Sequence, residues 1–80
     1  MAILDELAEK LAVEAMTAAK KKNDPTIIEV VAKTLGDSSQ TLEEAFLTVV
    51  RLRSAAERGH EALDAIIAGD ELDILDNPDL

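Results

Sequence analysis

Two breaker segments divide the 80-residue chain into three stretches of helical apolar periodicity. The first breaker is Asn23-Asp24-Pro25, and the second covers residues 36–40, which read Gly-Asp-Ser-Ser-Gln. Between and beyond them, apolar residues recur every three or four positions, which is typical of amphipathic helices. The β-branched run at 26–31 is also compatible with a strand, but the chain offers no second strand to pair with it. We therefore predict an all-α fold.

Local end signals set the expected helix boundaries at about 3–21, 25–35 and 41–68. Acids in the first turn of the first helix and three lysines at its end, Lys20 to Lys22, suit the helix dipole. Asp24 is a suitable N-cap with Pro25 as the first helical residue, and Gly36 is placed to end the second helix. The segment Thr41-Leu42-Glu43-Glu44 matches a capping box for the third helix, which we expect Gly69 to stop.

The apolar positions indicate which side of each helix is buried. The first helix presents a stripe that is rich in alanine toward its C-terminal end, so a neighbouring helix can approach closely there. The second presents Ile27, Ile28, Val31 and Leu35, with Val30 at the margin. The third carries a seam with alternating spacings of four and three: Ala45, Val49, Leu52, Ala56, Gly59, Leu63 and Ile66. This pattern predicts a three-helix bundle with a short second helix and a long third helix.

Gly59 lies on that seam and leaves two interpretations open. A glycine inside a helix costs about 1 kcal/mol relative to alanine, so the third helix either breaks there or keeps the glycine for packing. In the second case the missing side chain lets another backbone come close, from this chain or from a second copy.

The net charge of −9 is concentrated at the C-terminal end, where residues 70–80 hold five acids and no base. We expect one helical domain over residues 1–69 and an acidic tail over 70–80. The tail is partly disordered or docked, and Leu72 and Leu75 are its candidate contacts. An acidic surface gains nothing from counterion release on a phosphate backbone, which argues against nucleic acid and anionic lipid as partners.

The chain offers little chemistry for catalysis or metal binding. It has no cysteine, and its one histidine, His60, has no cluster of metal ligands beside it in the sequence. We therefore expect no enzymatic activity, no metal and no cofactor. No apolar run approaches the roughly 20 residues that span a bilayer, and the first residues lack the features of a signal peptide, so we expect a cytoplasmic protein with no membrane association.

Three apolar residues project away from the predicted buried stripes: Val13, Met16 and Leu47. Isolated exposed apolar residues are common, but a self-complementary surface is the alternative. We expect a homodimer that uses these residues and Gly59. The sequence thus favours a small protein-protein interaction or regulatory module.

The stretch 35–43, Leu-Gly-Asp-Ser-Ser-Gln-Thr-Leu-Glu, resembles the attachment site of acyl carrier proteins. In that family an Asp-Ser-Leu triplet opens a helix and the serine carries phosphopantetheine, so the resemblance implies that Ser38 bears this group. The chain departs from the family at Ser39, where the family has Leu or Met, and in its helical pattern before residue 36. Capping preferences also account for Asp, Ser and Thr before a helix. An acyl-carrier-like protein is the alternative function.

A helix-turn-helix DNA-binding unit is a third possibility, with the second and third helices as the motif. Glu43 and Glu44 would then stand at the leading end of the recognition helix, facing phosphates. The resulting repulsion argues against this function.

Overall fold

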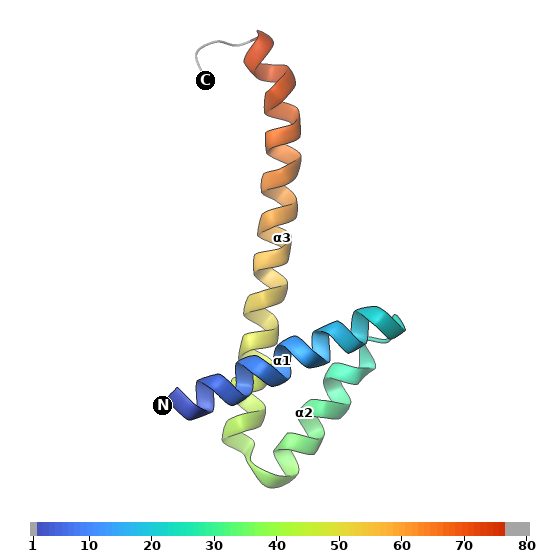
Figure 1. Cartoon of the computed structure of the whole chain (residues 1–80), viewed down its shortest axis with the longest axis vertical. Coiled ribbons are helices and arrows are strands. Elements are labelled where there is room, and N and C mark those ends of the chain that lie inside the picture. Colours follow the sequence, from blue (N-terminus) through green and yellow to red (C-terminus); the bar gives the residue numbers. More distant parts are fainter. Residues whose placement is uncertain (1, 77–80) are drawn as a thin grey trace.

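In the computed structural model, residues 2–76 form three helices: α1 (Ala2–Lys22), α2 (Thr26–Ser38) and α3 (Gln40–Asp76) (Figure 1). The backbone is described for residues 2–76 and the side chains for residues 2–69. The predicted all-α fold with a short second helix and a long third helix is confirmed. Leu72 and Leu75, the predicted contact residues of the acidic tail, have side chains outside the described part.

The junction between α1 and α2 follows from Asn23 and Asp24. Asn23 adopts a positive φ of 52°, and the N–H groups of Asn23 and Asp24 donate to the carbonyls of Lys20 (3.2 Å) and Ala19 (2.9 Å). These two bonds form a Schellman motif, which satisfies carbonyls at the end of α1. The Asp24 carboxylate then accepts from the Thr26 N–H at 3.0 Å and the Thr26 hydroxyl at 2.6 Å. The Asp24 side chain therefore caps the first N–H group of α2, as predicted, whereas Pro25, predicted as the first helical residue, precedes the helix.

The predicted end of α2 at Gly36 is wrong. The helix continues to Ser38, and Ser39 alone, with an extended φ of −157°, connects α2 to α3. Gly36 has no positive φ; its missing side chain instead admits Glu43, because a Cβ at Gly36 would lie 2.5 Å from Glu43 Oε1. The glycine therefore leaves room for the carboxylate end of the Glu43 side chain and does not form a turn.

The predicted capping box at Thr41 is also wrong. The Ser39 hydroxyl accepts from the Leu42 N–H at 3.1 Å, and the Ser39 carbonyl accepts from the Glu43 N–H at 3.0 Å. Ser39 is therefore the N-cap of α3, two residues before the predicted position. A serine and a threonine have the same capping chemistry, so the shortened link between the helices decided between them.

The core is built from small residues around one aromatic ring. Three alanines of α1 and Ala32 of α2 are buried, and Phe46 of α3 is the largest fully buried side chain in the described part. These buried alanines let the helices approach closely, as predicted for α1. The buried residues of α1 are Ala8, Ala12 and Ala15. The predicted apolar side of α2 is confirmed, since Ile28, Val31 and Leu35 pack against this core while Val30 stays 62% exposed.

Phe46 shows that the buried face of α3 differs from the predicted seam. Phe46 is displaced by about 100° from Ala45 around the helix, and Val49 and Val50 pack with it against the core. Ala45 and Val49 are half-buried, but the seam residues from Leu52 onward are exposed. Periodicity identifies the residues that share a face; it does not say which face a neighbouring helix covers.

Beyond residue 54, α3 protrudes from the packed part of the molecule (Figure 1). We call α1, α2 and residues 40–54 the head; residues 55–69 are all exposed. The Cα radius of gyration is 17.8 Å, whereas a compact domain of this size has about 12 Å. The helix is continuous at Gly59, and the predicted stop at Gly69 is wrong because α3 runs to Asp76. Within the described residues, no helix combines the length and apolarity that crossing a membrane requires.

Candidate interaction surface

The protruding part of α3 carries an apolar face that the described residues leave uncovered. Its large side chains are 52% exposed at Leu63, 56% at Ile66 and 49% at Ile67. The face begins within the head at Leu52, which is 65% exposed. Small residues occupy the positions between them. We call the whole set the α3 stripe: Leu52, Ala55, Ala56, Gly59, Ala62, Leu63, Ile66 and Ile67.

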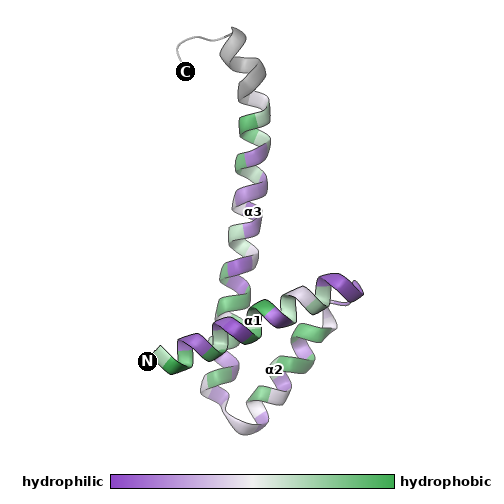
Figure 2. Ribbon diagram, in the orientation of Figure 1, coloured by the Kyte–Doolittle hydropathy of each residue, from purple (hydrophilic) through white to green (hydrophobic). Residues whose placement is uncertain are grey.

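Helical spacing places these residues on one side of α3. Successive residues turn by about 100°, so members three or four positions apart point in similar directions. Figure 2 shows hydrophilic and apolar positions alternating along this part of the helix, as expected when one side is apolar and the other is charged. A helix with such a face in a globular protein buries it against a neighbour. In the head, α1 and α2 supply that neighbour, but they end before the stripe does.

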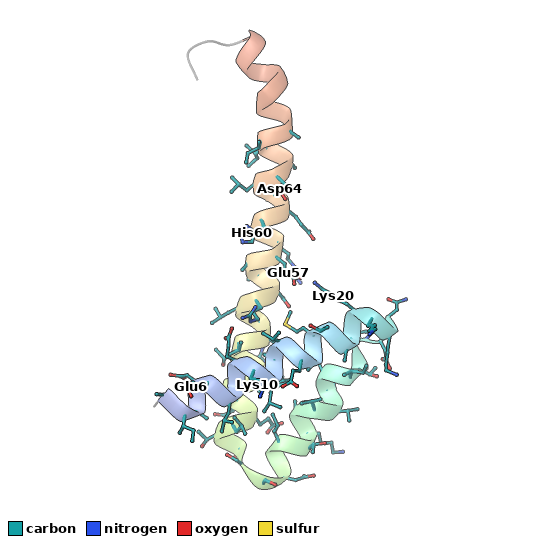
Figure 3. All side chains as sticks on the ribbon, in the orientation of Figure 1. Glu6, Lys10, Lys20, Glu57, His60 and Asp64 are labelled. Carbon is teal, nitrogen blue, oxygen red and sulfur yellow. The ribbon has the colours of Figure 1, made fainter. Side chains whose placement is uncertain are left out.

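Two ion pairs mark the edge of the head. Lys20 at the end of α1 donates to Glu57 at 2.8 Å (Figure 3), and Arg53 contacts Glu9 of α1. All four side chains are about half-exposed or more, so each pair contributes about 0–1 kcal/mol. They fix how α1 crosses α3 and lie on a different side of α3 from the stripe.

A shallow groove between α1 and α2 is a second apolar feature. It has a volume of about 230 Å³ and combines apolar side chains from both helices with one carboxylate. Its lining is Leu11, Glu14, Ala15, Ala18, Ile27 and Val31. A single carboxylate beside aliphatic side chains provides a surface for packing, not a set of reacting groups.

The residues predicted to form an interaction surface are distributed over α1 and α3. Val13 is 40% exposed and Met16 is half-buried, both on α1. The prediction that Leu47 projects away from the bundle is wrong, because Leu47 is half-buried and packs against the core. Only Gly59 belongs to the α3 stripe, where it has open space above it: no described atom lies within 4 Å of a Cβ built there. Within the described residues, no other part of the chain therefore packs against it.

The tail residues predicted to make contacts, Leu72 and Leu75, belong to the last turns of α3 by their backbone. Their side chains lie outside the described residues, so their role stays a prediction. The stripe members Ala55, Ala62 and Ile67 were missed by the sequence reasoning. Each stands three or four positions from a seam residue, so a wider face drawn around the same seam would have included them.

Ser38, the residue implied by the acyl-carrier resemblance, is exposed and is the last residue of α2. In that family the serine opens a helix, whereas here Ser39 holds the capping position before α3. Despite the local resemblance in sequence, Ser38 therefore ends a helix, whereas the corresponding serine of that family opens one.

The charged residues of the described part form no recognisable reaction centre. His60 is exposed on α3, with Glu57 and Asp64 one turn away on either side (Figure 3). Among the described residues, no group of three or more histidine and acidic side chains is placed to hold a metal ion.

Comparison with known proteins adds no relative: no protein-family model matches the chain, and neither curated proteins nor solved structures gave a significant match.

Proposed function

We propose that this chain is a non-enzymatic protein-protein interaction module that self-associates through the α3 stripe. The observation that carries the proposal is the exposure of four large aliphatic side chains, each 49–65% exposed, on one face of a helix. The head has no further helix in the described residues to cover this face. A second copy would bury it and add the apolar area that a small domain lacks.

The area available suggests a modest affinity. Fully burying a Leu or Ile side chain contributes about 1.5–3 kcal/mol, so covering a half-exposed one contributes about 1 kcal/mol. Four such side chains in each of two copies give about 8 kcal/mol, which is of the same order as the cost of association, about 4–15 kcal/mol. We therefore expect a dimer whose population depends on protein concentration.

The setting we propose is the cytoplasm. The chain contains no cysteine, so its stability depends on packing and not on an oxidising compartment. Packing of two α3 helices needs no cofactor and no metal, and the mechanism is burial of apolar faces with charged flanks that set the register.

The test is the oligomeric state of the wild-type chain and of one double variant. Leu63→Asp with Ile66→Asp places two carboxylates in the stripe, and we expect native mass spectrometry and analytical ultracentrifugation to show a dimer for the wild type and a monomer for the variant. Circular dichroism should show the same helix content for both at low concentration. A wild type that stays monomeric up to its solubility limit would refute the proposal.

Val30→Asp is the matched control, because Val30 is 62% exposed but belongs to α2. We expect this variant to remain dimeric. Loss of the dimer in the control would mean that the interface is on the head. Substitutions at Leu47 are unsuitable for this test, since that side chain packs on the core and its loss would destabilise the monomer.

A further inference from the structure

The groove between α1 and α2 is an apolar surface that the described part of the chain leaves open. Its volume is about 230 Å³, and Glu14 is the one charged residue in its lining. The apolar wall continues along α1, because Leu7 and Ile3 precede Leu11 at intervals of four residues and are 46% and 60% exposed. At about 1.5 Å per residue, the apolar side of α1 from Ile3 to Ala18 is about 22 Å long. This face is therefore long enough to receive about four turns of a helix.

The lining of the groove favours a helix as its occupant. The lining residues carry aliphatic side chains and one carboxylate, and they lie within α1 and α2, whose backbone groups bond to one another. An extended peptide packed there would bury N–H and C=O groups without partners, whereas a helix satisfies these groups internally. α1 and α2 already hold one helix in this way, since α3 packs on them around Phe46. Binding of an amphipathic helix in an apolar groove is a recurrent mode of protein recognition.

Lysines border this groove, although the chain as a whole has a net charge of −9. Lys10 lies four positions before Glu14 in α1, and it is exposed. Lys21 and Lys22 are also exposed and lie three and four positions after Ala18. Residues three or four positions apart share a face of a helix, so these lysines stand on the groove side of α1. The positions of α2 that share a face with its two lining residues are uncharged. The border of the groove therefore carries more positive than negative charge.

From these observations we infer that the α1–α2 groove binds an amphipathic helix of a partner protein that has acidic residues beside its apolar face. Carboxylates of the partner then lie next to the lysines of the border, and such charge complementarity favours fast and specific association. The choice of another protein over a second copy rests on the proposed self-association, in which the two α3 stripes cover each other and leave the groove free. An anionic membrane has the same sign of charge, but it is flat, and the strongly acidic chain is repelled by it.

Fluorescence anisotropy with designed peptides tests this inference. The probe is a labelled peptide of about 20 residues, a length that supports a helix in water, with leucines at helical spacing and glutamates beside them. A second peptide has the same leucines and carries lysines in place of the glutamates. We expect the acidic peptide to bind at least tenfold more tightly than the basic one, because it complements the lysines of the border. Equal affinities, tighter binding of the basic peptide, or no binding of either peptide would overturn the inference.

Two substitutions locate the bound peptide on the chain. Ala18→Glu places a carboxylate in the groove, and Lys21→Glu reverses an exposed charge at its border, so each should weaken binding of the acidic peptide at least threefold. Lys33→Glu is the matched control, because Lys33 is exposed on α2 at a position that does not share the groove face. The stripe variant Leu63→Asp with Ile66→Asp should bind the peptide as the wild type does. Loss of binding in the stripe variant, or unchanged binding in Lys21→Glu, would overturn the inference.

Native mass spectrometry of the same mixture separates this inference from the proposed function. We expect the acidic peptide to be bound to the dimer of the chain. Dissociation of the dimer by the peptide would show that the groove is a contact between copies and would overturn the inference. A wild type that is monomeric but binds the acidic peptide as expected would refute the proposed function and leave the inference standing. Binding to vesicles of phosphatidylcholine and phosphatidylserine that is lost in Lys21→Glu would assign this face to a membrane and overturn the inference.

Discussion

Replacement of Phe46 by alanine should remove a large part of the stability of the head. Phe46 is fully buried, and the other buried core residues in the described part are alanines. Phe→Ala substitutions in cores cost about 3–5 kcal/mol, and the cost rises with the cavity that remains. Because alanines have no side-chain torsions with which to fill a cavity, we expect a loss of about 4 kcal/mol.

This loss is large for a chain of this size. At about 0.05–0.15 kcal/mol per residue, 80 residues give a total stability of about 4–12 kcal/mol, and the protruding part of α3 adds little to it. With a urea m-value of about 1 kcal/mol/M, the midpoint of unfolding should fall by about 4 M. The variant should therefore keep about 0–8 kcal/mol of stability, and at the low end of this range it is largely unfolded without denaturant.

Urea unfolding followed by far-ultraviolet circular dichroism is the appropriate assay, because the chain has no tryptophan or tyrosine to report on packing by fluorescence. It should be run at a concentration where the chain is monomeric, so that association does not add to the stability. Val30→Ala, at an exposed position of α2, is the control and should stay within about 0.5 kcal/mol of the wild type. A Phe46→Ala loss below about 1 kcal/mol would contradict the packing of α1 and α2 around this ring.

Three further predictions address the helix ends and the protruding part. Ser39→Ala should lower the free energy of unfolding in urea by about 1 kcal/mol, because it removes the cap of α3. Thr41→Ala should change it by less than about 0.5 kcal/mol. A larger loss for Thr41→Ala than for Ser39→Ala would show that Thr41 is the N-cap. Gly59→Ala should stabilise α3 locally by about 1 kcal/mol in the monomer, since no described atom lies where the added methyl group would be. Amide hydrogen exchange around residue 59 should therefore slow. Unchanged or faster exchange would contradict a helical Gly59 with free space beside it. Ser38 should gain no mass when the protein is made together with a phosphopantetheinyl transferase, and an adduct that disappears in Ser38→Ala would support the acyl-carrier alternative instead.

The helix boundaries show which parts of the fold local sequence chemistry alone can predict. Asp24 contacts Thr26 at the start of α2, two residues away, so the sequence predicted this start to within one residue. At residues 36–41 several residues with similar capping ability follow one another, and local chemistry does not choose among them. In the structure α2 continues through Gly36, and the Ser39 hydroxyl is the group that caps α3.

The sequence by itself determined that the chain folds as three helices, which residues share a face on each, and that α3 is long, because periodicity and end signals act within a few residues along the chain. Only the tertiary structure decided which of these faces is buried. α1 and α2 are too short to cover all of α3, so they bury the face around Phe46 and leave the stripe around Gly59 exposed. An apolar stripe looks the same in the sequence whether its partner belongs to the same chain or to another molecule, since burial is a property of the contact and not of the helix.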